Sequence, residues 1–114
     1  MQAGRELDLE VAKALGWKVS EDEGIFCDED GHVVDEPKFS TTWEGMGELV
    51  EEAKKHKIYL EYAHEDQGYV GRAWEDGYSP DTPVVRSAPL AVTIAFLATQ
   101  GVYITEMDLT KEKL

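Results

Sequence analysis

The segment that most resembles a catalytic motif is HEDQG at residues 64–68. In a zinc-protease helix, the motif H-E-x-x-H supplies two histidines that bind the metal and a glutamate that acts as general base. Gly68 stands where the second histidine would be, so the motif is incomplete. The other histidines, His32 and His56, are scattered along the chain, and the single cysteine, Cys27, completes no zinc ligand set. We therefore expect no zinc site.

A second candidate for metal chemistry is the segment DEDGH at residues 28–32. Its composition is that of a calcium-binding loop, but the spacing D-x-D-x-D-G is not met and no glutamate stands at the twelfth position. Aspartate and glycine also tolerate the backbone geometry of tight turns. We interpret the segment as an acidic turn between two strands and expect no metal there.

The remaining sequence contains no recognisable set of catalytic groups. There is no glycine-rich phosphate loop, and no serine, cysteine or lysine lies in a nucleophile motif. Paired carboxylates are frequent, but with 24 acidic residues in the chain their proximity in sequence carries little information. The sequence predicts a protein that is not an enzyme and that uses no cofactor.

An anion-binding site is predicted at the start of the most apolar segment. Arg86 precedes Ser87, and the free N–H groups at the start of a helix favour an anion. If Arg72 points the same way, the two arginines could hold a phosphate or carboxylate against the rings of Tyr69 and Trp74. The alternative is that Arg86 offsets nearby acids and Ser87 only caps the helix.

A second binding feature is an acidic series of eight carboxylates in 16 residues. Gathered on one hairpin edge, they could present negative charge to a basic host protein. The alternative is a solvated edge that resists pairing with other strands. The series consists of Glu21, Asp22, Glu23, Asp28, Glu29, Asp30, Asp35 and Glu36.

The overall charge restricts the class of partner. The chain has 24 acidic residues against 11 lysines and arginines, a net charge of −13, which repels nucleic acid and anionic membranes at long range. We expect basic or neutral partners, with no direct contact to nucleic acid or membrane. Two alternative interpretations are that the charge serves solubility alone, or that it imitates nucleic acid as a decoy.

Length and terminal composition favour one cytoplasmic domain. A chain of 114 residues has the common size of a domain, and we expect one domain over residues 1–114. The N-terminal MQAGRELDLE has acids where a signal peptide needs an apolar core, and no segment is long and apolar enough to span a membrane. We expect a cytoplasmic protein.

The elements expected to position these residues are three helices and four strands. The segment SAPLAVTIAFLATQG has apolar or small residues on every side, so it predicts a fully buried helix. Alternation of apolar and polar residues predicts a hairpin around the turn at 66–68. The expected helices are Arg5–Leu15, Thr41–Lys55 and Ser87–Gly101. The expected strands are Ile25–Cys27, Val33–Val34, Ile58–Ala63 and Tyr69–Trp74. We expect residues 102–104 to extend the last helix or to add an edge strand, and residues 105–114 to fray.

Capping and glycine positions add detail to the second helix. Its N-cap is expected at Ser40, or at Thr41 with Glu44 as a capping box. Gly45 and Gly47 weaken a helix, which suggests that another backbone passes close to them.

The order of elements predicts the fold class. Sequential hairpins favour an antiparallel sheet, and three helices exceed what one face of a four-stranded sheet holds. We therefore predict an α+β fold, a three-layer α/β/α sandwich with a mainly antiparallel four-stranded sheet. The side of the last helix that carries Ala91, Ala95 and Ala98 is a candidate homodimer seam.

Three blocks of the sequence resemble a known family. The blocks are AGRELDLEVAKALGW at 3–17, FSTTWEGMGELVEEA at 39–53 and SAPLAVTIAFLA at 87–98. They look like the three helical blocks of the phage ABA sandwich domain family. The resemblance implies a phage or prophage origin and a layered fold, and it implies no activity. Where relatives carry Cys and Arg after APLA, this chain has Val92, Thr93 and Ile94.

These observations leave three hypotheses for function. The first is a non-catalytic phage or prophage accessory protein that binds and modulates a host component, in a possible counter-defence role, through its acidic surface. The second is an oligomer that sequesters a phosphate-bearing nucleotide near Arg72 and Arg86. The third is a virion or assembly component.

Overall fold

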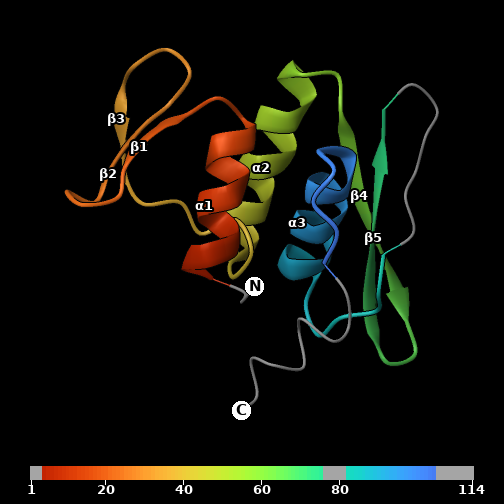
Figure 1. The fold of residues 1–114 in the computed structure, drawn as a ribbon. Coiled ribbons are helices and arrows are strands. Elements are labelled where there is room, and N and C mark those ends of the chain that lie inside the picture. The colour runs from red at the N-terminus through yellow and green to blue at the C-terminus, as the bar shows by residue number, and fades with distance from the viewer. Residues whose placement is uncertain (1–3, 76–81, 105–114) are drawn as a thin grey trace.

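The computed structural model describes residues 4–75 and 82–104. The predicted frayed tail at 105–114 and residues 76–81 of the predicted loop lie outside this part of the chain. Within it, helices and strands follow one another as shown in Figure 1. In chain order they are α1 (Arg5–Ala14), β1 (Lys18–Ser20), β2 (Ile25–Cys27), β3 (Val33–Val34), α2 (Trp43–Lys55), β4 (Tyr59–Glu65), β5 (Gly68–Trp74) and α3 (Ala88–Thr99).

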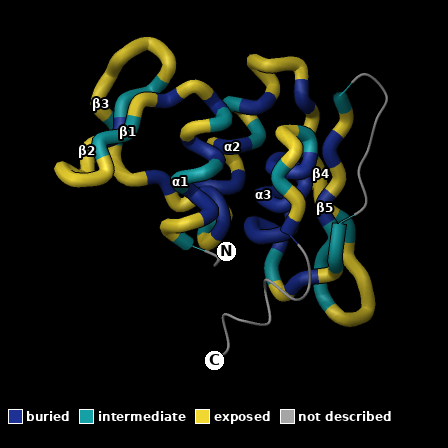
Figure 2. Tube along the Cα trace, in the orientation of Figure 1, coloured by how far each residue is buried: buried dark blue, intermediate teal, exposed yellow. Residues whose placement is uncertain are grey.

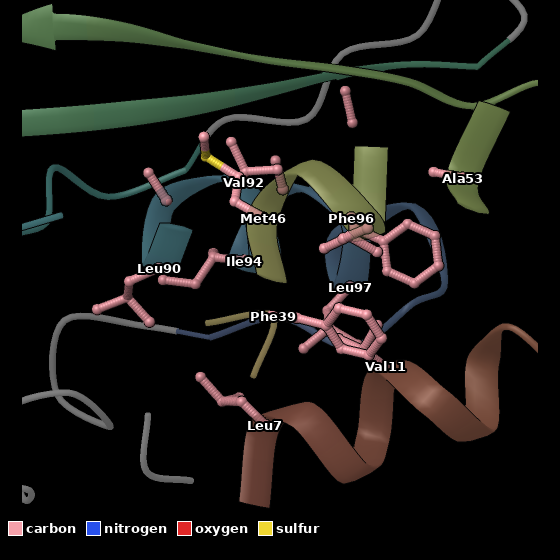
Figure 3. Close-up of a cluster of buried hydrophobic side chains, with 14 of the residues drawn as sticks. Leu7, Val11, Phe39, Met46, Ala53, Leu90, Val92, Ile94, Phe96 and Leu97 are labelled. Carbon is pink, nitrogen blue, oxygen red and sulfur yellow. The ribbon is translucent and has the colours of Figure 1, made fainter. Parts of the chain in front are cut away.

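Helix α3 forms the buried centre of the fold, as its composition predicts. Every residue from Ala88 to Ala98 is buried. In Figure 1 the helix lies between the β4–β5 hairpin on one side and α1 and α2 on the other. Figure 3 shows Ile94 and Leu97 of α3 on the side of α1, which carries Leu7 and Val11. Burial of each such side chain contributes roughly 1.5–3 kcal/mol.

The prediction of one four-stranded sheet is wrong. The described strands form two separate antiparallel sheets: three strands in the order β1-β2-β3, and the hairpin β4-β5. Strand β1 was not predicted. Figure 1 shows the two sheets at opposite sides of the helices, because the helices fill the space between the two hairpins. The α+β class is confirmed, but the central layer is helical and not a sheet.

The side of α3 predicted as a homodimer seam is buried within the chain and covered by its own hairpin, whereas the homodimer itself stays a prediction. Ala91 and Ala95 have no exposed surface, and Ala98 is buried. Gly71 of β5 packs so closely that a Cβ atom there would lie 2.0 Å from the Ala91 carbonyl oxygen. The small residues of α3 thus allow β5 to approach the helix backbone within one chain.

Helix α2 begins one residue later than the predicted Thr41 cap implies and two later than the predicted Ser40 cap implies. Thr42 is the N-cap, and its Oγ1 accepts a hydrogen bond from the Gly45 amide at 2.9 Å. Ser40 serves a different helix, because its Oγ accepts from the Gly4 amide at 2.9 Å, one residue before α1. The Ser87 cap is confirmed: its Oγ accepts from the Leu90 amide at 3.3 Å.

A buried carboxylate joins α1 to the segment before α2. Asp8 is 3% exposed, and its Oδ1 accepts a hydrogen bond from the Ser40 amide at 2.8 Å. Burial raises the pKa of Asp8 to about 6, although the hydrogen bonds from Ser40 act in the opposite direction. Asp8, Ser40 and Gly4 all belong to the blocks that carry the family resemblance, and here their role is structural.

Candidate functional site

Three residues of the predicted anion site, Tyr69, Arg72 and Trp74, lie on two faces of the β4–β5 hairpin, and the other two, Arg86 and Ser87, directly precede α3. Because side chains alternate along a strand, Arg72 and Trp74 point to the face opposite that of Tyr69. On their face, Glu61 contacts both: Trp74 Nε1 donates to Glu61 Oε1 at 3.3 Å, and an Arg72 nitrogen lies 3.9 Å from the same oxygen.

The other face carries an aromatic cluster. The ring of Tyr69 lies 4.8 Å from that of His64 and 5.9 Å from that of Tyr62. The backbone of Tyr69 pairs with Val85, which brings Tyr69 near the start of α3, where Arg86 is exposed and Ser87 caps the helix. The structure therefore brings Arg72 together with Trp74, and Tyr69 close to the Arg86 backbone. It does not gather the five residues of the predicted anion site in one place.

The predicted acidic series is divided between the two ends of the small sheet. Glu21–Glu23 form the turn between β1 and β2, whereas Asp28–Asp30 lie in the turn between β2 and β3. Figure 2 shows exposed backbone at both turns. Asp35 and Glu36 follow β3 on the way to α2.

Several of these carboxylates make contacts within the chain. Three side-chain contacts link members of the series to α1 or to the end of α2: Lys13–Glu21 at 3.3 Å, Arg5–Glu36 at 3.1 Å and His56–Glu29 at 2.6 Å. Exposed pairs of this kind contribute little stability. They lie between the small sheet, or the segments next to it, and α1 or the end of α2.

The Asp28 turn is held by its own backbone amides. Asp28 Oδ1 accepts from the amides of Asp30 at 2.9 Å and His32 at 3.0 Å, and the His32 hydrogen bond is the main reason that the pKa of Asp28 is lowered. Ligand atoms of Asp28, Asp30 and His32 lie within 4.8 Å of one another. This proximity follows from the turn, in which Asp28 acts as the capping side chain.

A groove that is open to solvent lies between the small sheet and α2. Its volume is about 1070 Å³. Six carboxylates and one lysine line it together with apolar residues. The lining residues are Trp17, Asp28, Val33, Val34, Asp35, Glu36, Pro37, Lys38, Thr42, Glu44, Gly45, Glu48 and Glu52. We call this surface the acidic groove.

One wall of the acidic groove is a row of glutamates on α2. Glu44, Glu48 and Glu52 recur every four residues, so they lie on one face of the helix about 6 Å apart along its axis. Like charges at this spacing destabilise a helix. The pKa of Glu48 is raised by partial burial and by the charges of Glu52 and Glu44. The sequence analysis did not single out this row, although the four-residue repeat of like charge was a usable signal.

The other wall is the segment from β3 to Lys38, and two contacts hold it against α2. A Cβ atom on Gly45 would lie 2.0 Å from the Lys38 carbonyl oxygen, so glycine permits the close approach that its position in the sequence suggested. Thr42 Oγ1 also donates to that oxygen at 3.1 Å. A Cβ atom on Gly47, by contrast, would meet no described atom within 4 Å, so the expected close approach of another backbone does not occur there.

The acidic groove also has apolar lining residues, among them Trp17 and Val33. Trp17 is 5% exposed and packs edge-on against Phe39, with ring centroids 5.6 Å apart. Its indole N–H is buried and finds no acceptor among the described residues. Val33 remains 74% exposed. The site therefore combines negative walls with apolar surface.

One glutamate of the α2 wall, Glu52, is paired with Lys55 of the same helix. The Lys55 ammonium lies 3.2 Å from both carboxylate oxygens of Glu52. The hydrogen bond and charge of Glu52, followed by the charges of Asp30 and Glu29, raise the pKa of Lys55. This pair occupies one end of the row and leaves Glu44 and Glu48 as the rest of the negative wall.

None of the helices in the described residues is long and apolar enough to cross a membrane. Neither a family model nor a curated protein matches the sequence. Among solved structures, the fold is similar to that of a phage protein from Bacillus cereus, with a TM-score of 0.71 and 16% sequence identity over 89% of this chain and 90% of that one. At this identity the likeness concerns the fold alone, so the chain shares its α+β architecture with a phage protein.

Proposed function

We propose that this chain is a non-catalytic phage or prophage accessory protein that binds a basic segment of a host protein in the acidic groove. The observation that carries the proposal is the combination of six carboxylates with apolar lining residues in one groove. A cationic segment would neutralise the walls while its aliphatic stems cover Trp17, Val33 and Pro37. The fold shared with a phage protein supports the accessory role.

The charge of the whole chain supports the same class of partner. A net charge of −13 accelerates encounter with a cationic surface, and complementary charges then favour the correct partner over others. The row at Glu44 and Glu48 is maintained at an electrostatic cost to α2, which a bound cation would relieve. Solubility requires negative charge but no clustering of it. A groove in which neighbouring carboxylates repel one another is therefore better explained by binding of a cation than by solubility.

The proposal is tested by affinity capture from nuclease-treated host lysate with three baits. These are the wild-type chain, Glu44→Gln/Glu48→Gln, and the matched control Glu51→Gln/Glu65→Gln, whose exposed residues lie outside the groove. Both variants lose two charges, so non-specific capture of basic proteins falls equally.

The expected result is a partner that the wild type and the control retain and that the groove variant loses. Purified, that partner should bind the wild type directly. Equal losses with both variants would contradict a role for the groove, and so would a partner that both variants retain.

A further inference from the structure

We infer that two copies of this chain pair through the outer edge of β4, antiparallel and about a two-fold axis at Tyr62. The pairing joins the two hairpins into one four-stranded sheet with the order β5-β4-β4-β5. No residue of β4 lines the acidic groove, so this dimer is independent of the proposed function. It places the predicted homodimer contact on the hairpin instead of on α3.

The register of the hairpin shows which backbone groups of β4 face its outer edge. Glu65 and Gly68 flank the two-residue turn, so they form the hydrogen-bonded pair that closes the hairpin, and every second pair along the ladder is hydrogen-bonded in the same way. The backbone groups of the alternate residues Leu60, Tyr62 and His64 therefore point away from β5. Among the described residues, no hydrogen bond reaches these outward N–H and C=O groups.

The opposite edge of the hairpin, by contrast, is covered by the chain itself. The outward amide and carbonyl groups of Tyr69 in β5 pair with Val85 at 2.7 and 2.8 Å, and the Gly71 carbonyl oxygen accepts from Thr82 Oγ1 at 2.8 Å. Strand β4 has no such cover within residues 4–75 and 82–104. It is also seven residues long, with no lysine, proline or bulge, so it lacks the usual protection of an edge strand against pairing.

Exposed aromatic side chains flank β4 on both faces of the hairpin. On one face, the ring of Tyr62 lies 5.5 Å from that of Trp43 in α2, and both side chains are exposed. On the other face, Tyr59 and Trp74 form an exposed cross-strand pair. A strand added to this edge therefore gains apolar burial as well as main-chain hydrogen bonds.

The sequence of β4 fits pairing with itself in one register. With Tyr62 opposite Tyr62 of the second copy, all seven residues pair, Glu61 stands opposite Ala63, and Glu65 stands opposite Tyr59. Only shifts by two residues keep the outward backbone groups together, and the nearest such shifts place Glu61 opposite Glu61 or Glu65 of the second copy. Because like charges directly opposite one another destabilise a sheet, the centred register is favoured. It gives a closed two-fold dimer.

Sedimentation equilibrium of the full chain tests this dimer with variants of β4. Tyr62→Lys places two lysines directly opposite one another and should weaken the dimer by at least about tenfold. Tyr59→Lys is the matched control, because it changes another exposed tyrosine of β4 but places the lysine opposite Glu65; it should weaken the dimer by less than about threefold. A mixture of Tyr62→Lys and Tyr62→Glu should dimerise within about threefold of the wild type, because opposite charges then meet.

Cysteine crosslinking tests the register without adding charge. In a Cys27→Ala background, Tyr62→Cys should form an intermolecular disulfide in air, because the Cα atoms of an opposed pair lie about 5.5 Å apart. Ala63→Cys is the control, because its two copies are diagonal neighbours about 8 Å apart, beyond the reach of a disulfide.

Three results refute pairing at β4: a chain that stays monomeric at millimolar concentration, a dimer that Tyr62→Lys leaves intact, and a lysine–glutamate mixture that fails to dimerise. Crosslinking of Ala63→Cys as readily as Tyr62→Cys refutes the axis at Tyr62. Added salt should tighten the dimer, because it screens the repulsion between two chains of net charge −13, whereas it should weaken binding of a cationic segment in the acidic groove. Failure of the dimer and failure of the proposed function are therefore distinguishable.

Discussion

Neutralising the central glutamate of the α2 row should stabilise the unliganded protein. Glu48 has Glu44 four residues before it and Glu52 four residues after it, and all three line the acidic groove. Each like-charge pair at this spacing destabilises a helix by roughly 0.2–0.5 kcal/mol, so Glu48→Gln should stabilise the protein by about 0.4–1 kcal/mol at neutral pH. Glutamine and glutamate have similar helix propensities, so propensity contributes little to the difference.

The effect should depend on pH with a defined sign. The pKa of Glu48 is raised above its ordinary value of 4.5, so the folded protein binds this proton more tightly than the unfolded chain does. Wild-type stability therefore falls as the pH rises from the ordinary pKa through the raised one. The advantage of Glu48→Gln should be full above the raised pKa and should disappear below pH 4.5, where wild-type Glu48 is protonated in both states.

Urea unfolding monitored by circular dichroism measures this difference. With a slope near 1.5 kcal/mol/M, the expected gain moves the midpoint up by about 0.3–0.7 M in low salt, and added salt reduces the shift. Glu51→Gln is the control, because Lys54 and Lys55 follow Glu51 at three and four residues and offset its charge. The reasoning is refuted if Glu48→Gln is destabilising at neutral pH, or if Glu51→Gln gives the same gain.

Two further predictions concern the residues that hold the fold. Gly71→Ala places a Cβ atom 2.0 Å from the Ala91 carbonyl oxygen and should destabilise the protein by roughly 1–3 kcal/mol. In Gly47→Ala the new Cβ atom meets nothing within 4 Å, so this substitution should stabilise the protein by about 0.5–1 kcal/mol. The two variants should shift the thermal midpoint in opposite directions, and shifts in the same direction would contradict the prediction. Asp8→Asn keeps an acceptor for the Ser40 amide but removes the titration of a carboxyl whose pKa rises from 3.8 to about 6. The free energy of unfolding of Asp8→Asn minus that of the wild type should grow by up to about 3 kcal/mol between pH 4 and pH 7, and a difference independent of pH would exclude the raised pKa.

Local elements were predictable because their signals are local. The segment at 87–101, which has apolar or small residues on every side, correctly predicted α3, and Ser87 and Gly101 indicated where the helix begins and ends. The alternation around the turn at 66–68 gave the β4–β5 hairpin, which the structure pairs from Tyr59↔Trp74 to Glu65↔Gly68. In each case the deciding contacts lie within a few residues.

The sheet arrangement was not predictable, because it depends on contacts between distant segments. Apolar periodicity shows which side of a strand is buried but not which other strand it pairs with. Strand β1 has three residues and pairs with β2 through Val19↔Phe26, too short a pattern to distinguish from a loop. Ser40 was assigned to α2 on local grounds, whereas its partners are Gly4 and Asp8, more than 30 residues away.

The binding surface was predictable in part. Asp28, Asp35 and Glu36 of the predicted acidic series line the acidic groove, whereas Glu21–Glu23 lie at the opposite end of the small sheet. The α2 wall was missed because an exposed glutamate on an amphipathic helix is usually only solvated. The packing of Gly45 against Lys38 and the hydrogen bond from Thr42 to Lys38 bring that helix face and the segment after β3 together.

The most direct test of a cation-binding groove is an NMR titration of the isotopically labelled chain with a lysine-rich peptide. We predict that amide shifts concentrate at residues 33–38 and around Glu44 and Glu48, and that they disappear in Glu44→Gln/Glu48→Gln. Shifts spread over the acidic residues of the whole surface, or centred on the β4–β5 hairpin around Arg72, would contradict the account.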